Sequence, residues 1–177
     1  VCDSMKRILF LAILFLTFAG LFSHAEAQSE EDFEKKGLKH FDSAVFKAIP
    51  QKNKVRADAE FALAEIAFQK AIEKNPNRVS AYLHLGRTYS AQKKYAAAAE
   101  TYRLALEIAP QQKKIYLSLA SALEKDGNYR GAINALEELR ALESDDRAIR
   151  IIDDFIGKME KRAAGTDPDN SQSGELP

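Results

Sequence analysis

The chain has 177 residues, and its 26 Lys and Arg residues balance its 26 Asp and Glu residues at a net charge of +0. A neutral chain has no overall basic field to attract nucleic acid, so we expect no nucleic-acid partner. Its single cysteine is Cys2. This excludes a fold held by disulfides, so stability has to come from apolar packing.

The first 27 residues have the layout of a secretory signal peptide. A basic Met5-Lys6-Arg7 segment precedes an apolar run at 8–22, and small residues stand at Ala25 and Ala27. We expect cleavage after Ala27, which makes the protein exported and periplasmic (or secreted). The alternative is an uncleaved inner-membrane anchor, although the apolar run is shorter than the ~20 residues that a bilayer span needs.

Residues 31–76 predict a long helical hairpin, with helices at roughly 31–48 and 54–75 and a short turn around Pro50. A bulky loop in place of longer helices is the less favoured alternative. The stretch 47–56 is locally basic, and we interpret it as a solvated turn. Contact with an acidic partner or with an anionic membrane surface is the alternative for its Lys47, Lys52, Lys54 and Arg56.

Two consecutive stretches, 79–112 and 113–146, repeat each other at a spacing of 34 residues. Matched positions carry the same side chains: Tyr82 and Tyr116, Leu85 and Leu119, Tyr95 and Tyr129, Ala98 and Ala132. The first copy reads Tyr82-x-x-Leu85-Gly86-x-x-Tyr89, then Ala98-x-x-x-Tyr102-x-x-Ala105, then Pro110. A repeat of this length is typical of a solenoid, in which each unit buries its apolar face against its neighbours.

This pattern resembles the tetratricopeptide repeat, a pair of antiparallel helices with small and large residues at these places. The resemblance implies an all-α fold, a short right-handed α-solenoid of helix pairs with a C-terminal capping helix. We expect Gly86 and Ala98 to let the two helices approach closely, and Pro110 to end the second helix. The resemblance also implies a protein that holds another protein.

The stretch 31–76 fits the same pattern as a degenerate first repeat. Its second helix matches the next unit in register through Ala64, Phe68, Ala71 and Pro76. Gly37 lies 27 residues before Ala64, whereas the same interval in the next unit is 12 residues. This difference is what indicates longer helices in the first unit.

Residues 145–163 predict a final helix that caps the last repeat, with apolar residues at helical spacing at Ile149, Ile152, Phe155, Ile156 and Met159. The alternative is that this face, through Ile152, Phe155, Ile156 and Met159, packs against a second copy in a homo-oligomer. Residues 164–177 have little to bury, which predicts a disordered tail.

The sequence shows no recognisable catalytic, cofactor or metal site. Beyond residue 27 the only histidines are His40 and His84, which are too few ligands for zinc without cysteines. His84 is interpreted as a surface or groove residue. The glycines lack the spacing of phosphate-binding loops. We therefore expect no enzymatic activity and no cofactor.

In this family the first helices of the stacked repeats line a concave groove. The resemblance places ten residues there: Ser80, Leu83, Arg87, Ser90, Ala91, Lys114, Leu117, Ser121, Glu124 and Lys125. One apolar residue per helix among basic residues suits an extended or helical peptide of some acidic character. We expect a protein or peptide partner in the cell envelope, and membrane contact only if the signal is uncleaved.

One subset of the family holds the carboxylate tail of chaperones with a clamp of Lys and Asn. In this chain Leu83 and Arg87 stand where those residues would be found, and the first unit offers Glu34 and Leu38. Chaperone-tail docking is therefore not expected.

Overall fold

The structure is a computed structural model that describes residues 29–166. The predicted signal peptide and residues 167–177 of the predicted tail lie outside this range. Within it the chain is all-α and contains no strand, which confirms the expected helical solenoid. None of the helices in the described part of the chain is long and apolar enough to cross a membrane.

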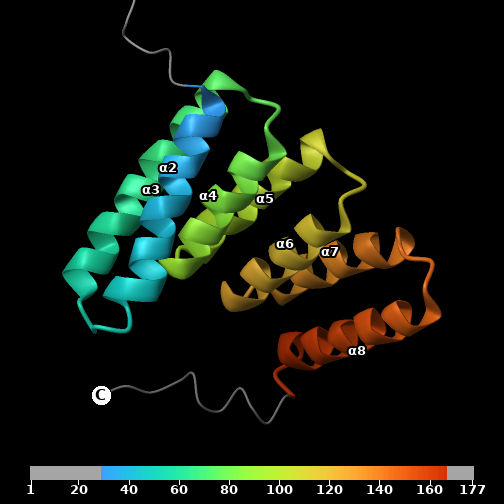
Figure 1. Cartoon of the computed structure of the whole chain (residues 1–177). Helices are drawn as coiled ribbons and strands as arrows, with labels where there is room; N and C mark the ends of the chain where they lie inside the picture. Colours follow the sequence, from blue (N-terminus) through green and yellow to red (C-terminus); the bar gives the residue numbers. More distant parts are fainter. Residues whose placement is uncertain (1–28, 167–177) are drawn as a thin grey trace, which may run out of the picture.

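The helices follow one another as antiparallel pairs, and each pair packs on the next (Figure 1). The elements are α2 (Glu30–Ser43), the π-helical η1 (Ala44–Ala48), α3 (Lys54–Lys74), α4 (Val79–Ala91), α5 (Tyr95–Ile108), α6 (Lys113–Lys125), α7 (Tyr129–Ala141) and α8 (Asp146–Ala163). The first pair is α2 and η1 with α3, the next two pairs are α4–α5 and α6–α7, and α8 packs on α7.

Local sequence signals fix several helix ends. The Ser29 side chain accepts a hydrogen bond from the Asp32 backbone N–H, and the Asp32 carboxylate accepts one from the Ser29 backbone N–H, which makes a capping box at the start of α2. Asn128 caps α7 in the same way through the backbone N–H of Gly131. Pro76 follows the end of α3, at the place expected for a residue that cannot continue a helix.

A small residue on the first helix of each pair makes room for a large side chain on the second. A Cβ atom on Gly86 would lie 2.5 Å from the Tyr102 ring, and one on Gly37 would lie 2.5 Å from the Phe68 ring. The expectation that Gly86 sits where two backbones meet is therefore corrected, because the ring of Tyr102 occupies that space. In the third pair a residue with a Cβ, Ala120, stands at this place, and the matching large residue is a leucine rather than an aromatic ring.

One apolar cluster runs through α5, α6, α7 and α8, and partly buried residues of α4 pack against it. Ile152 and Met159 of α8 belong to this cluster and are 6% and 3% exposed. The alternative in which these two residues pack against a second copy is therefore wrong, because the core of the same chain already covers them. Phe155 on the same helix is 45% exposed and remains available.

Candidate functional site

The first helices of the second and third pairs, α4 and α6, enclose a shallow cavity of about 300 Å³. Five of the predicted groove residues line it: Ser90, Lys114, Leu117, Ser121 and Lys125. These α6 positions recur at intervals of three or four residues, which places them on one face of that helix. The structure therefore brings together the α6 half of the predicted groove with the end of α4.

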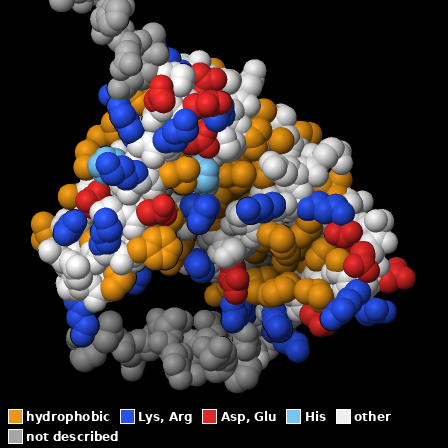
Figure 2. Space-filling model, viewed as in Figure 1, with side chains coloured by type: hydrophobic (Ala, Val, Ile, Leu, Met, Phe, Trp, Pro, Cys, Tyr) orange, Lys and Arg blue, Asp and Glu red, His pale blue; other side chains and the backbone are white. Residues whose placement is uncertain are grey.

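A second, apolar cavity of about 220 Å³ adjoins the first, and Leu117 and Ser121 line both. Its walls come from α6, α7 and α8: Leu117, Ala120, Ser121, Glu124, Ala132, Leu136, Phe155 and Met159. Figure 2 shows an apolar hollow between α6 and α8, edged by Lys and Arg side chains. Leu117 is 49% exposed and Phe155 is 45% exposed, so two large apolar side chains of this cavity face solvent.

The contribution of α8 to this groove was not predicted from the sequence. Phe155 was expected on a capping or self-association face, whereas it lines the same cavity as Leu117. No local signal in the sequence reveals this, because the place of α8 relative to α6 depends on how both helices pack on α7.

The remaining predicted groove residues lie outside these two cavities. Leu83 is partly buried and packs against the main apolar cluster. Arg87 is exposed, and its guanidinium lies 5.3 Å from the centre of the Phe41 ring, which links α4 to α2. Ser80 is half-buried and Ala91 is exposed, and neither lines these cavities.

The groove is basic at its surface. Lys114 and Lys125 are exposed, whereas Glu124, the acid that lines the apolar cavity, is ion-paired with Arg162 of α8. Tyr102 lies at the floor of the first cavity, and burial raises the pKa of its phenol, although hydrogen bonds with Ser90 and Ser118 act in the opposite direction. The site thus offers hydroxyl groups and exposed lysines around an apolar centre.

His84 does not lie on the open surface. Its ring stacks on Phe68 of α3 with centres 5.4 Å apart, and its Nε2 lies 3.4 Å from Oε1 of Glu34. The sequence interpreted His84 as a surface or groove residue; its side chain is 22% exposed and belongs to the joint between α4 and the first pair. Burial lowers the pKa of His84.

Glu34 is nearly buried and receives a hydrogen bond from Nε of Arg78 at 2.5 Å. Its carboxylate therefore holds two partners, Arg78 and His84, and has no role in a clamp that faces solvent. Leu38, the other first-unit residue at a clamp position, packs against a small apolar cluster with Phe68.

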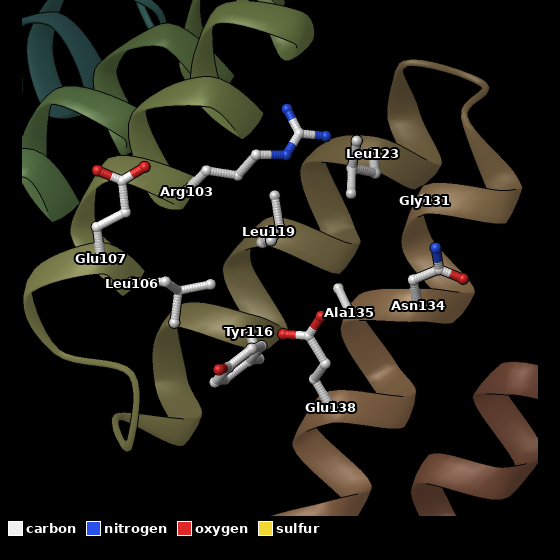
Figure 3. Close-up of a pocket in the computed structure, with 10 residues that line it drawn as sticks. All are labelled: Arg103, Leu106, Glu107, Tyr116, Leu119, Leu123, Gly131, Asn134, Ala135 and Glu138. Atoms are coloured by element: carbon white, nitrogen blue, oxygen red, sulfur yellow. The ribbon is translucent and has the colours of Figure 1, made fainter.

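A third cavity, of about 460 Å³, lies on the opposite side of α6, between α5, α6 and α7 (Figure 3). Leu119 and Tyr116 form its floor, and Arg103, Glu107 and Glu138 stand around it. The Tyr116 hydroxyl donates to the backbone carbonyl of Pro110 at 3.0 Å, so this ring is held by the loop before α6. The mixed charges here favour no single sign of ligand.

No group of three His, Cys, Asp or Glu residues between positions 29 and 166 is arranged to hold a metal ion.

Comparisons with known proteins agree with this architecture. Two family models, each described as tetratricopeptide repeat, match the chain over residues 55–113 and 89–151. The peroxisomal targeting signal receptor of Pichia angusta is 27% identical over 126 residues, which covers 63% of this chain and 22% of the receptor. This chain therefore spans about a fifth of the length of that curated relative.

Two solved structures illustrate the shared fold. The TPR2B domain of yeast Sti1, in a complex with a pHsp70 peptide, gives a TM-score of 0.57 at 17% identity and covers 75% of this chain and 97% of that chain. The Yersinia enterocolitica secretion chaperone SycD, in complex with a peptide of the translocator YopD, gives a TM-score of 0.51 at 15% identity, with coverage of 73% and 93%. At these identities the likeness shows the fold alone.

Proposed function

Residues 55–151 of this chain carry tetratricopeptide repeats, and from this premise we propose that the protein is a non-enzymatic interaction module. Its groove between α4, α6 and α8 holds a segment of a partner protein. The observation that carries the proposal is the pair of adjoining cavities that share Leu117 and Ser121.

The chemistry of the groove defines the segment that it holds. Leu117 and Phe155 offer exposed apolar surface, which binds an apolar anchor of the partner. Lys114 and Lys125 lie at the rim of the groove and favour acidic residues beside that anchor. The segment is therefore a short extended or helical peptide with at least one large apolar side chain and acidic neighbours.

We further propose that the module acts outside the cytoplasm as a scaffold or assembly factor of the cell envelope. The support is the signal-peptide layout of residues 1–27, with its basic start, apolar run and Ala25 and Ala27. Mass spectrometry of the native protein tests this part, because an N-terminus at Gln28 is the expected result. An intact apolar run would instead make the protein a membrane-anchored scaffold with the same groove.

Site-specific photo-crosslinking in native cell envelopes tests the groove. A photoreactive residue at position 117 is compared with one at position 104, because Leu104 is 41% exposed on α5 and lines neither of the two groove cavities. We expect one dominant envelope protein to crosslink at 117 and not at 104. Equal adducts from both positions contradict the groove assignment, and adducts only with a second copy of this chain favour self-association.

Charge reversal gives a second readout once a partner has been captured. Lys114→Glu combined with Lys125→Glu should weaken capture strongly, because both cations border the apolar anchor site. A matched double reversal, Arg130→Glu with Arg150→Glu, changes the net charge equally at exposed positions elsewhere. Equal losses in the two variants would point to a long-range charge effect instead of groove contacts.

A further inference from the structure

The first helical pair projects beyond the repeats at one end. In the repeat register, Phe61 matches Tyr95, where α5 begins, yet α3 begins at Lys54, seven residues earlier. At a rise of 1.5 Å per residue this extension adds about 10 Å. On the other side of the turn, η1 lengthens α2 to match, so the segment 44–60 forms a projecting tip (Figure 1).

The tip exposes apolar side chains that the fold does not use. Phe46 is 72% exposed, Ile49 is 49% exposed and Val55 is 82% exposed. The interior of the tip is already filled by a separate small cluster, which consists of Ala44, Ala48, Ala57 and Phe61. The three exposed side chains are therefore surplus to packing, and they gather within ten residues of one another.

The same tip carries an excess of basic residues in a chain that is neutral as a whole. Its four basic residues, Lys47, Lys52, Lys54 and Arg56, are all exposed, whereas its two acids, Asp58 and Glu60, both have partners. The nearest acid on α3, Asp58, pairs with Lys54 at 2.7 Å, and both side chains are exposed.

A hollow of about 560 Å³ beside the tip extends this basic surface along α2. Phe46 borders it together with three lysines, Lys35, Lys39 and Lys47, and with one acid, Asp42. The excess of cations around an apolar ring favours phosphate-bearing ligands at this end of the molecule.

We infer that this tip binds an anionic lipid membrane. Phe46, Ile49 and Val55 enter the interface between headgroups and acyl chains, and the four basic residues contact the anionic headgroups. The apolar side chains stand exposed on a projecting end, and only Phe46 borders a hollow, which suits insertion into a fluid interface better than docking of a shaped protein. An acidic protein at the same tip is the competing occupant.

This inference is independent of the groove proposed above. The tip belongs to α2, η1 and α3, whereas the groove is built by α4, α6, α7 and α8. Membrane contact at one end would leave the groove free to hold its peptide, so the two proposals can fail separately.

The test uses the absence of tryptophan from the full chain. Phe46→Trp introduces a single fluorophore at the tip, and Leu104→Trp introduces one at an exposed apolar position on α5, outside both the tip and the groove. Each variant is mixed with vesicles of phosphatidylcholine alone or with one quarter phosphatidylglycerol. We expect the tryptophan emission to shift to the blue and to be quenched by brominated lipid only for Phe46→Trp, and only with the anionic vesicles.

Charge reversal in the Phe46→Trp background provides the matched control. Lys47→Glu, Lys54→Glu and Arg56→Glu together should reduce partitioning by about 100-fold or more, because each basic residue near an anionic surface contributes about fivefold. The same number of reversals at the exposed residues Lys93, Arg130 and Arg150 should leave partitioning within about threefold.

Three results would overturn the inference. The first is no shift of Phe46→Trp with anionic vesicles. The second is an equal shift of Leu104→Trp, or an equal shift on neutral vesicles, because binding would then be neither specific to the tip nor dependent on anionic headgroups. The third is a shift of Phe46→Trp with soluble polyglutamate but not with vesicles, which would assign the tip to an acidic protein.

Discussion

The first helical pair and the units that follow it are held together by different means. From α5 to α8 a single apolar cluster of buried residues is continuous, and α4 packs against it. The first pair has one small cluster of its own and shares a second with Leu85 of α4. Polar contacts add to this joint: Glu34 with Arg78 and His84, and Glu65 with the hydroxyl of Tyr89 at 3.1 Å.

Polar contacts also hold the two helices of the first pair to each other. His40 and Ser43 of α2 both bind the carboxylate of Glu60 on α3, at 2.7 Å and 2.9 Å. In a solenoid each unit buries its apolar face on the next, so every interior unit gains apolar burial from two neighbours. The first pair has a neighbour on one side only, so directional polar contacts there replace part of the burial that inner units obtain from two neighbours.

The largest expected effect comes from removing the ring at the centre of the first pair. Phe68 is 0% exposed, and Phe68→Ala should cost about 3–5 kcal/mol through lost burial and the cavity left behind. Because units contact mainly their neighbours, hydrogen exchange should accelerate in α2 and α3 and much less in α6 to α8.

Leu136→Ala is the matched change, because Leu136 holds the equivalent place in the third pair and is 5% exposed. It should cost about 2–5 kcal/mol and accelerate exchange in α6, α7 and α8. Uniform acceleration over all helices in both variants would show one cooperative unit and remove the distinction between the two regions.

A smaller effect tests why the second pair has a glycine where the third has an alanine. Gly86→Ala places a Cβ against the Tyr102 ring, which should cost about 1–3 kcal/mol in urea unfolding. Adding Tyr102→Leu reproduces the Ala120 and Leu136 pair of the third unit. The double variant should therefore lose less unfolding free energy than the sum of the losses in the two single variants. Gly157→Ala is the control, because a Cβ there meets nothing within 4 Å, and it should stabilise α8 by up to about 1 kcal/mol.

The sequence predicted the repeating frame well, because the 34-residue period, the prolines and the apolar spacing are local signals. It did not predict the joint between the first two units. Arg78 and Glu34 are 44 positions apart, and no spacing rule pairs them. The same limit explains why Phe155 was not placed in the same cavity as Leu117, since that depends on how α6 and α8 both pack on α7.

The turns between paired helices contain residues with positive φ. Substitutions there should change the free energy of unfolding by about 1 kcal/mol. Gly127 in the third pair has a φ of 79°, and its equivalent in the second pair, Lys93, has a φ of 62° without being glycine. Lys93→Gly should therefore stabilise the protein, and Gly127→Lys should destabilise it, each by about 1 kcal/mol in urea unfolding. If Lys93→Gly instead destabilises the protein, or Gly127→Lys stabilises it, then neighbouring contacts and not backbone strain decide which residue stands at that turn.

The smallest expected effect concerns pH at the joint between the two regions. Burial lowers the pKa of His84 below its ordinary 6.5, against the pull of Glu34, while Arg87 and Lys114 also lower it and Asp42 raises it. The unfolded chain then takes up a proton before the folded one does, so stability is lost as pH falls from about 6.5 toward the folded pKa. The loss cannot exceed about 1.4 kcal/mol per pH unit for one group.

The variant His84→Phe keeps an aromatic ring against Phe68 but has no group at position 84 that takes up a proton. The free energy of unfolding of this variant should therefore fall less between pH 7.5 and pH 5.5 than that of the parent protein. Urea unfolding at both pH values measures this difference, and the offset at pH 7.5 isolates the lost contact with Glu34. NMR titration of His84 gives the direct check. A pKa above 6.5 would mean that Glu34 outweighs burial, and the joint would then tighten on acidification instead of loosening, which reverses the expected order of the two proteins.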